Sequence, residues 1–200
     1  MLFDADGVLQ HRPGGWETAF EEWLGVRAQD FLHEMFVAEK PAMSDQRDAV
    51  EILAEVLQRW GIDAPAEEVF AAVWLRIEPD PASLALVRRL RRAGYGVHLG
   101  TNQSRRRAAY MRTEVGYDEL FDVSCYSAEL RLAKPDPGYF TRAAELIAAP
   151  AAEVLFIDDL AENVAGAREA GMAAIHWHLR EGHDLLEKQL AERGVVPAGT

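Results

Sequence analysis

Cysteine is scarce in this sequence of 200 residues, and long apolar runs are absent from it. A single cysteine, Cys125, excludes an internal disulfide and is compatible with a reducing compartment, so we expect a cytoplasmic protein. Its apolar, strand-like surroundings favour a buried structural thiol over a reactive one. We see no segment that could cross a bilayer and no basic region followed by an apolar stretch, and we therefore expect neither a membrane anchor nor a signal peptide.

Positive charge is scarce as well. The chain has 21 lysines and arginines against 33 aspartates and glutamates, which gives a formal net charge of −12 at pH 7. This balance argues against nucleic acid and against an anionic membrane surface as partners, because both require a basic face. It is compatible with a small anionic substrate, since a local cluster of cations or a metal ion can outweigh the net charge.

From residue 79 onward, apolar runs at strand spacing alternate with amphipathic runs at helical spacing. Including the short apolar run before Asp4, we expect strands at 1–3, 96–101, 121–126, 153–158 and 173–177, and helices at 80–93, 104–115, 136–148, 160–170 and 184–193. Such alternation is typical of an α/β fold. We therefore predict a doubly wound, Rossmann-like core with a parallel five-stranded sheet.

About ninety residues separate the first two predicted strands, far more than one crossover helix requires. Four apolar stripes at helical spacing occupy this stretch, at 19–24, 31–36, 50–60 and 69–77. The aromatic residues fall on these stripes, which favours a helical core of their own over an aromatic binding surface. We predict a helical-bundle cap at 14–79, inserted into a core formed by 1–13 and 80–200.

Polar side chains follow the predicted strands at the points where the strands end. They are Asp4, Asp6, Thr101, Asn102, Lys134, Asp158 and Asp159. The carboxyl ends of parallel strands meet at one edge of a sheet, where such folds bind their ligands. Buried carboxylates are costly unless they are paired with a cation, and Mg²⁺ prefers oxygen ligands from carboxylates and phosphates. The chain has only three lysines, so the presence of Lys134 in this set is informative.

Four motifs occur in order along the chain: FDADGVL at 3–9, LGTNQ at 99–103, AKPDP at 133–137 and FIDDLAEN at 156–163. On these motifs the whole chain resembles the haloacid dehalogenase-like (HAD) hydrolase superfamily, in the subgroup with a helical cap inserted after the first strand. The resemblance implies that Asp4 is a nucleophile that forms an aspartyl-phosphate. It implies that Asp6 protonates the leaving oxygen and then deprotonates the attacking water.

The resemblance also implies the roles of the other strand-end residues. Thr101, the backbone near Asn102 and Lys134 would bind the phosphoryl group, and Lys134 would neutralise its charge. Asp4, the backbone carbonyl of Asp6 and Asp158 would hold Mg²⁺, with Asp159 and Asn163 as supporting residues. Two alternatives stay open: Asp159 as a helix cap, and Thr101 as a helix cap in place of Ser104.

The opening motif raises a question of charge, because Asp4 and Asp6 are close in the chain. For Asp6 to act as an acid at neutral pH, its pKa must be raised, and we expect the neighbouring carboxylates to raise it. Gly7 lets the backbone turn away from the crowded site. The three arginines at 105–107 could steer phosphate, but a solvated helix face is the favoured interpretation.

These observations predict a Mg²⁺-dependent phosphatase that hydrolyses a small phosphorylated metabolite, a phosphomonoester, as a monomer or homodimer. Asp6 favours phosphate over halide, because a halide leaves without a proton. Two alternatives remain: a phosphomutase of the same family, and a catalytically silent regulatory or binding relative. The cap is expected to close over the site and select the leaving group.

Overall fold

The structure, a computed structural model, describes residues 1–199. The side chains of Glu17, Glu22 and Trp23 lie outside the described residues, and with them the predicted place of Trp23 in the first apolar stripe. No helix within 1–199 is both long enough and apolar enough to cross a membrane.

Five parallel strands form the central sheet in the order β5-β4-β1-β6-β7. Their bounds are β1 Leu2–Phe3, β4 His98–Thr101, β5 Ser124–Tyr126, β6 Leu155–Asp158 and β7 Ala173–His176. The shortest strand, β1, is central: Phe3 pairs with Leu99 of β4 on one side and with Ile157 of β6 on the other. The predicted parallel five-stranded sheet is confirmed, and its order reverses next to β1, where the first motif begins.

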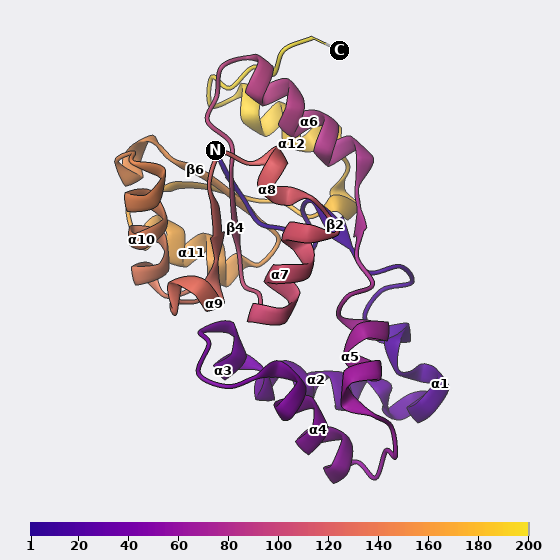
Figure 1. Cartoon of the computed structure of the whole chain (residues 1–200). Coiled ribbons are helices and arrows are strands. Elements are labelled where there is room, and N and C mark those ends of the chain that lie inside the picture. The colour runs from indigo at the N-terminus through magenta and orange to yellow at the C-terminus, as the bar shows by residue number, and fades with distance from the viewer. Residues whose placement is uncertain (200) are drawn as a thin grey trace.

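Helices cover both faces of the sheet, as the two helical layers of Figure 1 show. On one face lie α6 Pro81–Arg92, α7 Arg105–Thr113, α8 Tyr117–Leu120 and α12 His183–Ala191, which share an apolar cluster with Phe3 of β1. On the other lie α10 Pro137–Ile147 and α11 Ala161–Glu169, which share a cluster with Leu2. Leu2 and Phe3 serve opposite faces because successive side chains of a strand alternate.

The single cysteine lies in β5, on the α10 side of the sheet. Cys125 is fully buried, and burial raises the pKa of its thiol to about 12. The thiol is therefore protonated and unreactive at neutral pH. The prediction of a buried structural cysteine is confirmed.

A helical cap is inserted between β1 and β4. It contains α1 Glu21–Leu24, α2 Ala28–Ala38, α3 Lys40–Met43, α4 Ala49–Arg59 and α5 Ala66–Val73, with two short 3-10 helices, η1 Glu17–Ala19 and η2 Gly25–Arg27. The cap buries its own apolar cluster, in which the ring of Phe20 packs 4.4 Å from that of Phe31. The helical core predicted for the aromatic residues is confirmed. Figure 1 shows the cap at the end of the sheet opposite the N-terminus, which is the end where the strands finish.

Two short strands, β2 Gln10–His11 and β3 Glu78–Pro79, pair antiparallel where the chain enters and leaves the cap. The backbone N–H of Asp80 also donates to the Leu9 carbonyl at 2.8 Å. This ribbon holds together the two segments that connect the cap to the core. A second contact joins α3 of the cap to α9 Ser127–Leu130 of the core. The domain boundaries at 13/14 and 79/80 stay a proposal.

Candidate active site

Lys134 links two of the predicted carboxylates in the interior. Its Nζ donates to Asp4 Oδ1 and to Asp158 Oδ2, both at 2.7 Å, and to the Gly100 carbonyl at 3.0 Å. Asp4 follows β1, Asp158 ends β6, and Lys134 lies in the loop before α10, so three separate segments meet here. Burial acts to lower the pKa of Lys134, but the charges of Asp158 and Asp4 outweigh it and raise the pKa, which keeps the ammonium charged.

Asp159 brings a third carboxylate to this place. Carboxylate oxygens of Asp4, Asp158 and Asp159 all lie within 4.8 Å of one another. One lysine cannot neutralise three carboxylates. Burial raises the pKa of Asp4 to about 8, with Asp158 and Asp159 adding to the shift, and burial followed by Asp158 raises the pKa of Asp159 to about 6. Three hard oxygen donors and a surplus of negative charge are what Mg²⁺ requires, so these residues fit the metal.

Two residues of the FIDDLAEN motif hold the Asp158 carboxylate. Asn163 of α11 donates from Nδ2 to both Asp158 oxygens, at 3.0 and 3.1 Å, and the Leu160 N–H donates to Oδ1 at 2.8 Å. These contacts fix the orientation of the Asp158 carboxylate. Asp159 does not cap α11, whose N-cap residue is Leu160, and its carboxylate belongs to the cluster instead.

Thr101 is buried in β4 and does not cap a helix; Ser104 stands at the N-cap of α7, without a side-chain cap hydrogen bond. Thr101 Oγ1 accepts from Gln103 Nε2 at 3.0 Å, which leaves its own hydroxyl proton able to donate. The side chain of Asn102 bonds the backbone of Lys134 in both directions: Nδ2 donates to the carbonyl and Oδ1 accepts from the N–H, each at 2.9 Å. The role predicted for the backbone near Asn102, binding of a phosphoryl oxygen, stays a prediction.

Asp6 lies apart from the three clustered carboxylates. Arg107 donates to both of its oxygens, at 2.8 Å from Nη2 to Oδ1, and Gln10 and Gln103 donate at 3.0 and 2.9 Å. Burial acts to raise the pKa of Asp6, but the Arg107 guanidinium and these donors outweigh it and lower the pKa to about 2. The predicted rise in this pKa is therefore wrong. Neighbouring carboxylates alone would raise this pKa, and the cation that lowers it comes from α7.

Arg107 is also the residue for which the predicted solvated helix face is wrong. It is buried, while Arg105 and Arg106 on the same helix are exposed. Burial acts to lower the pKa of Arg107, and the charges of Asp6 and Glu39 outweigh burial and raise it. In the sequence this site shows only as three consecutive arginines. That pattern does not indicate that Arg107 points inward while Arg105 and Arg106 point outward.

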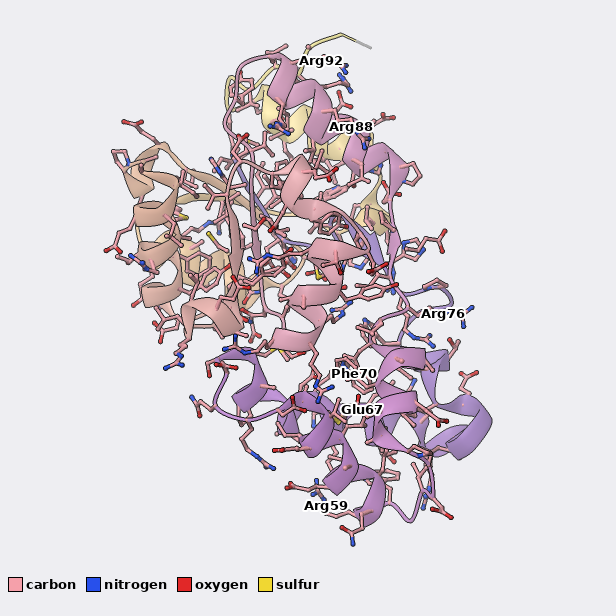
Figure 2. The ribbon with its side chains drawn as sticks, in the orientation of Figure 1. Arg59, Glu67, Phe70, Arg76, Arg88 and Arg92 are labelled. Carbon is pink, nitrogen blue, oxygen red and sulfur yellow. The ribbon has the colours of Figure 1, made fainter. Side chains whose placement is uncertain are left out.

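The two outward arginines join the core to the cap. Arg105 Nε donates to Asp45 at 2.9 Å, and Arg106 donates to Asp48 at 2.8 Å and to Glu67 at 3.0 Å. Figure 2 labels Glu67 on α5, at the boundary between the cap and α7. We call these three acidic residues and two arginines the clasp. It holds the cap against the site by charges that water can still reach.

Comparison with known proteins identifies the family of this chain. The pattern of the haloacid dehalogenase-like hydrolases matches residues 1–171. The phosphatase MT3486 of Mycobacterium tuberculosis is 35% identical over 190 residues, which cover 87% of this chain and 84% of that one. The sesquiterpene phosphatase astK of Aspergillus oryzae is 34% identical over 101 residues, or 50% of this chain and 51% of the relative. The chain thus spans about half the length of that curated relative.

Solved structures agree in fold. A HAD family enzyme from Bacteroides thetaiotaomicron, in complex with magnesium and inorganic phosphate, superposes with a TM-score of 0.70 at 22% identity. The match covers 88% of this chain and 91% of that one. With the sheet order, the inserted cap and the strand-end carboxylates described above, the match to the family pattern leads to one conclusion: this protein belongs to the haloacid dehalogenase-like hydrolases.

Proposed function

We propose that this hydrolase is a Mg²⁺-dependent phosphatase that cleaves a small phosphomonoester through an aspartyl-phosphate on Asp4. The observation that carries the proposal is the buried Lys134 ammonium, 2.7 Å from both Asp4 and Asp158 and beside Asp159. A phosphate dianion is repelled by a carboxylate nucleophile. Concentrated positive charge beside that nucleophile makes the approach possible.

In the first half-reaction, a carboxylate oxygen of Asp4 attacks phosphorus, and the bond from phosphorus to the leaving oxygen breaks. Lys134 orients the Asp4 carboxylate and offsets the charge on the phosphoryl oxygens. The free hydroxyl proton of Thr101 and the backbone N–H groups near Asn102 bind those oxygens. When bound by Asp4, Asp158 and the backbone carbonyl of Asp6, with Asp159 and Asn163 in support, Mg²⁺ supplies the positive charge that stabilises the in-line transition state.

In the second half-reaction, Asp6 removes a proton from the water that attacks the phosphorus of the aspartyl-phosphate. The bond between phosphorus and the Asp4 oxygen breaks, which regenerates the Asp4 carboxylate and releases inorganic phosphate. Asp6 is ionised before this step, because its three partners Gln10, Gln103 and Arg107 make four hydrogen bonds to it and donate in all of them. To protonate a leaving oxygen in the first half-reaction, Asp6 has to carry a proton. Its contact with Arg107 must therefore loosen while the leaving group is bound.

The substrate class rests on the cap and on the relatives. The clasp holds the cap over the strand ends, which favours a small leaving group over a phosphoprotein. Two of the similar proteins carry the word phosphatase in their names. The buried Cys125 fits a reducing compartment such as the cytoplasm. Compartment, state of assembly and the natural metabolite stay predictions.

The test is turnover of p-nitrophenyl phosphate by the wild type and by Asp4→Asn, each with Mg²⁺ and with EDTA. We expect release of p-nitrophenol that requires Mg²⁺ and falls by at least about 10³-fold in Asp4→Asn, because a carboxamide is a far weaker nucleophile than the carboxylate that it replaces. Asp63→Asn, an exposed position on the cap, makes the same chemical change away from the site and should keep wild-type turnover.

Circular dichroism and thermal unfolding would show that both variants fold. If folded, Mg²⁺-loaded wild type does not release p-nitrophenol, the phosphatase proposal fails. The result would favour a phosphomutase or a silent relative. Equal turnover by Asp4→Asn would remove Asp4 as the nucleophile and leave the metal requirement to be explained by other residues.

A further inference from the structure

The Arg107 guanidinium connects the Asp6 carboxylate to the cap. Besides the two contacts with Asp6, its Nη1 donates to Gln103 Oε1 at 2.8 Å, and its Nε donates to the backbone carbonyl of Trp74 at 2.8 Å. Trp74 follows α5 at the end of the cap. The ring of Trp16, where the chain enters the cap, lies 5.6 Å from the Arg107 guanidinium carbon.

We propose that Arg107 is a positioning residue that holds the Asp6 carboxylate in one orientation and makes this orientation depend on the position of the cap on the core. The proposal rests on the proposed function, since it concerns the step in which Asp6 activates water. It adds a residue to that step, and it gives the cap a second task besides selecting the leaving group.

The geometry of a guanidinium supports the proposal. Its N–H groups lie in one plane, so the directions of Nε and both Nη atoms are fixed relative to one another. The Trp74 carbonyl holds Nε, and this contact sets the plane in which the Nη atoms meet Asp6. A shift of the cap that moves the Trp74 carbonyl therefore turns or releases the carboxylate.

Energetics favour a role in orientation rather than in stability. Arg107 is buried and its contact with Asp6 is partly buried. Such an ion pair often contributes little net stability, because the cost of removing the charges from water offsets their attraction. A bidentate arginine gives geometric definition that an apolar pair cannot give.

Cap residues complete the surroundings of Arg107. The ring of Trp74 lies 6.0 Å from that of Trp16, and its Nε1 donates to the carboxylate of Glu39 at 3.1 Å. Glu39 follows α2 in the cap, and its charge acts on Arg107. Three segments of the cap thus face one arginine of the core, so movement of the cap as a body changes all of these contacts together.

The neighbouring Arg106 provides a matched control. It lies on the same helix and binds Asp48 and Glu67 of the cap, but it has no contact with Asp6. Replacing it removes these exposed contacts of the clasp but keeps the contact of Arg105 with Asp45 and that of Arg107 with the Trp74 carbonyl. Comparison of the two positions separates the exposed contacts between cap and core from the buried contact that orients Asp6.

The experiment measures kcat, KM and the fraction of phosphorylated enzyme with p-nitrophenyl phosphate, whose leaving group needs no proton. In Arg107→Met we expect kcat to fall by about 100-fold, the lower range for loss of general base catalysis. We expect KM to fall with it, so that kcat/KM changes by less than about threefold, because the first half-reaction is spared. Phosphorylated enzyme should accumulate, and Arg107→Lys, which keeps the charge without the fork, should recover part of kcat.

Two comparisons sharpen the result. In Arg106→Met we expect a higher KM without accumulation of phosphorylated enzyme. In the Asp6→Asn background, Arg107→Met should cause no further loss of kcat, because the residue through which Arg107 acts is already removed. An equal loss in both backgrounds overturns the proposal, as does an Arg107→Met variant whose kcat/KM falls as far as kcat.

A wild type without turnover would instead overturn the proposed function. A crystal structure of Arg107→Met decides the positioning role without relying on turnover. A displaced or disordered Asp6 carboxylate in that structure supports the role. A carboxylate that keeps its place on Gln10 and Gln103 contradicts it.

Discussion

The side chain of Asn102 holds the backbone of Lys134 from both sides. Its Nδ2 donates to the Lys134 carbonyl and its Oδ1 accepts from the Lys134 N–H, each at 2.9 Å. Among side chains of this size, only an amide offers a donor and an acceptor in this arrangement. The position of the Lys134 ammonium between Asp4 and Asp158 therefore depends on Asn102.

From this pair we predict that Asn102→Asp lowers kcat by about 10- to 100-fold, since a displacement of about 1 Å at a reacting group can cost two orders of magnitude. The carboxylate would meet the Lys134 carbonyl without a proton to donate. Asn102→Ala should lose less, because it removes the contacts without adding repulsion. Turnover of p-nitrophenyl phosphate and thermal unfolding check both; a wild-type kcat in Asn102→Asp would contradict the account.

Gly7 makes room for Asp159. A Cβ atom on Gly7 would lie 2.5 Å from Asp159 Oδ2, and the backbone there has φ +77°. We predict that Gly7→Ala raises the Mg²⁺ concentration for half-maximal activity by about tenfold or more, because it displaces a carboxylate that supports the metal. Gly116→Ala is the matched control: it has the same φ of +77° and nothing within 4 Å of the added atom.

Both alanine variants place a side chain at the same positive φ, so the difference between them reports the contact with Asp159. Titration of activity with Mg²⁺ measures it. Equal Mg²⁺ requirements in the two variants would show that the place of Asp159 does not matter to the metal.

The clasp should make substrate binding sensitive to salt. Its partners Arg106 and Glu67 are partly exposed, and salt weakens ion pairs that water reaches. The screening length falls from about 10 Å at 0.1 M to about 3 Å at 1 M, so the weakening grows with salt. We predict that KM rises by a few-fold between about 0.05 and 0.5 M KCl while kcat changes less. Arg106→Met should start from a higher KM and respond less to salt. The same salt response in the variant and the wild type would place its origin elsewhere, for example in screening of the phosphate itself.

Stability of the metal-free protein should fall as pH rises. The pKa of Asp159 is raised to about 6 and that of Asp4 to about 8, above their unfolded values near 4. The stability that these groups contribute is present below about pH 4 and is lost as pH rises through their folded-state values. Asp6, with its pKa lowered to about 2, contributes stability that is present above about pH 4 and is lost as pH falls toward about 2.

Mg²⁺ should offset this loss, since it binds the ionised carboxylates and competes with protons. We predict that the gap in Tm between Mg²⁺ and EDTA widens by a few degrees, about 2–4 °C per kcal/mol, from pH 5 to pH 8. Thermal unfolding at both pH values checks it. In Asp159→Asn the widening should be smaller; a gap that is the same at pH 5 and pH 8 in the wild type would contradict a metal site at these carboxylates.

The parallel sheet and its carboxylate edge could be predicted because three of its five strands, β1, β4 and β6, are buried runs that end at a motif. Asp4, Thr101 and Asp158 lie at or directly after strand ends, and a parallel sheet brings such positions together. The short elements escaped prediction for a physical reason. Strands β2 and β3 have two residues each and α8 and α9 have four, too few to show alternation or helical period.

The partner of Asp6 could not be predicted, because it depends on which face of α7 turns inward. The side chains of Arg105 and Arg107 are 63% and 7% exposed, although the two residues are chemically identical and two positions apart. The direction of the pKa shift of Asp6 could not be predicted for the same reason. Local sequence showed only acidic neighbours, while the decisive cation lies 101 residues further along the chain.

The most direct test of the central claim is to trap the covalent intermediate. Enzyme turning over p-nitrophenyl phosphate with Mg²⁺ is quenched and treated with borohydride, which reduces an aspartyl-phosphate to homoserine, and the peptides are sequenced by mass spectrometry. The account predicts homoserine at position 4 and nowhere else, and a larger fraction of it in Arg107→Met. Steady turnover with an unmodified Asp4, or homoserine at another aspartate, would contradict it.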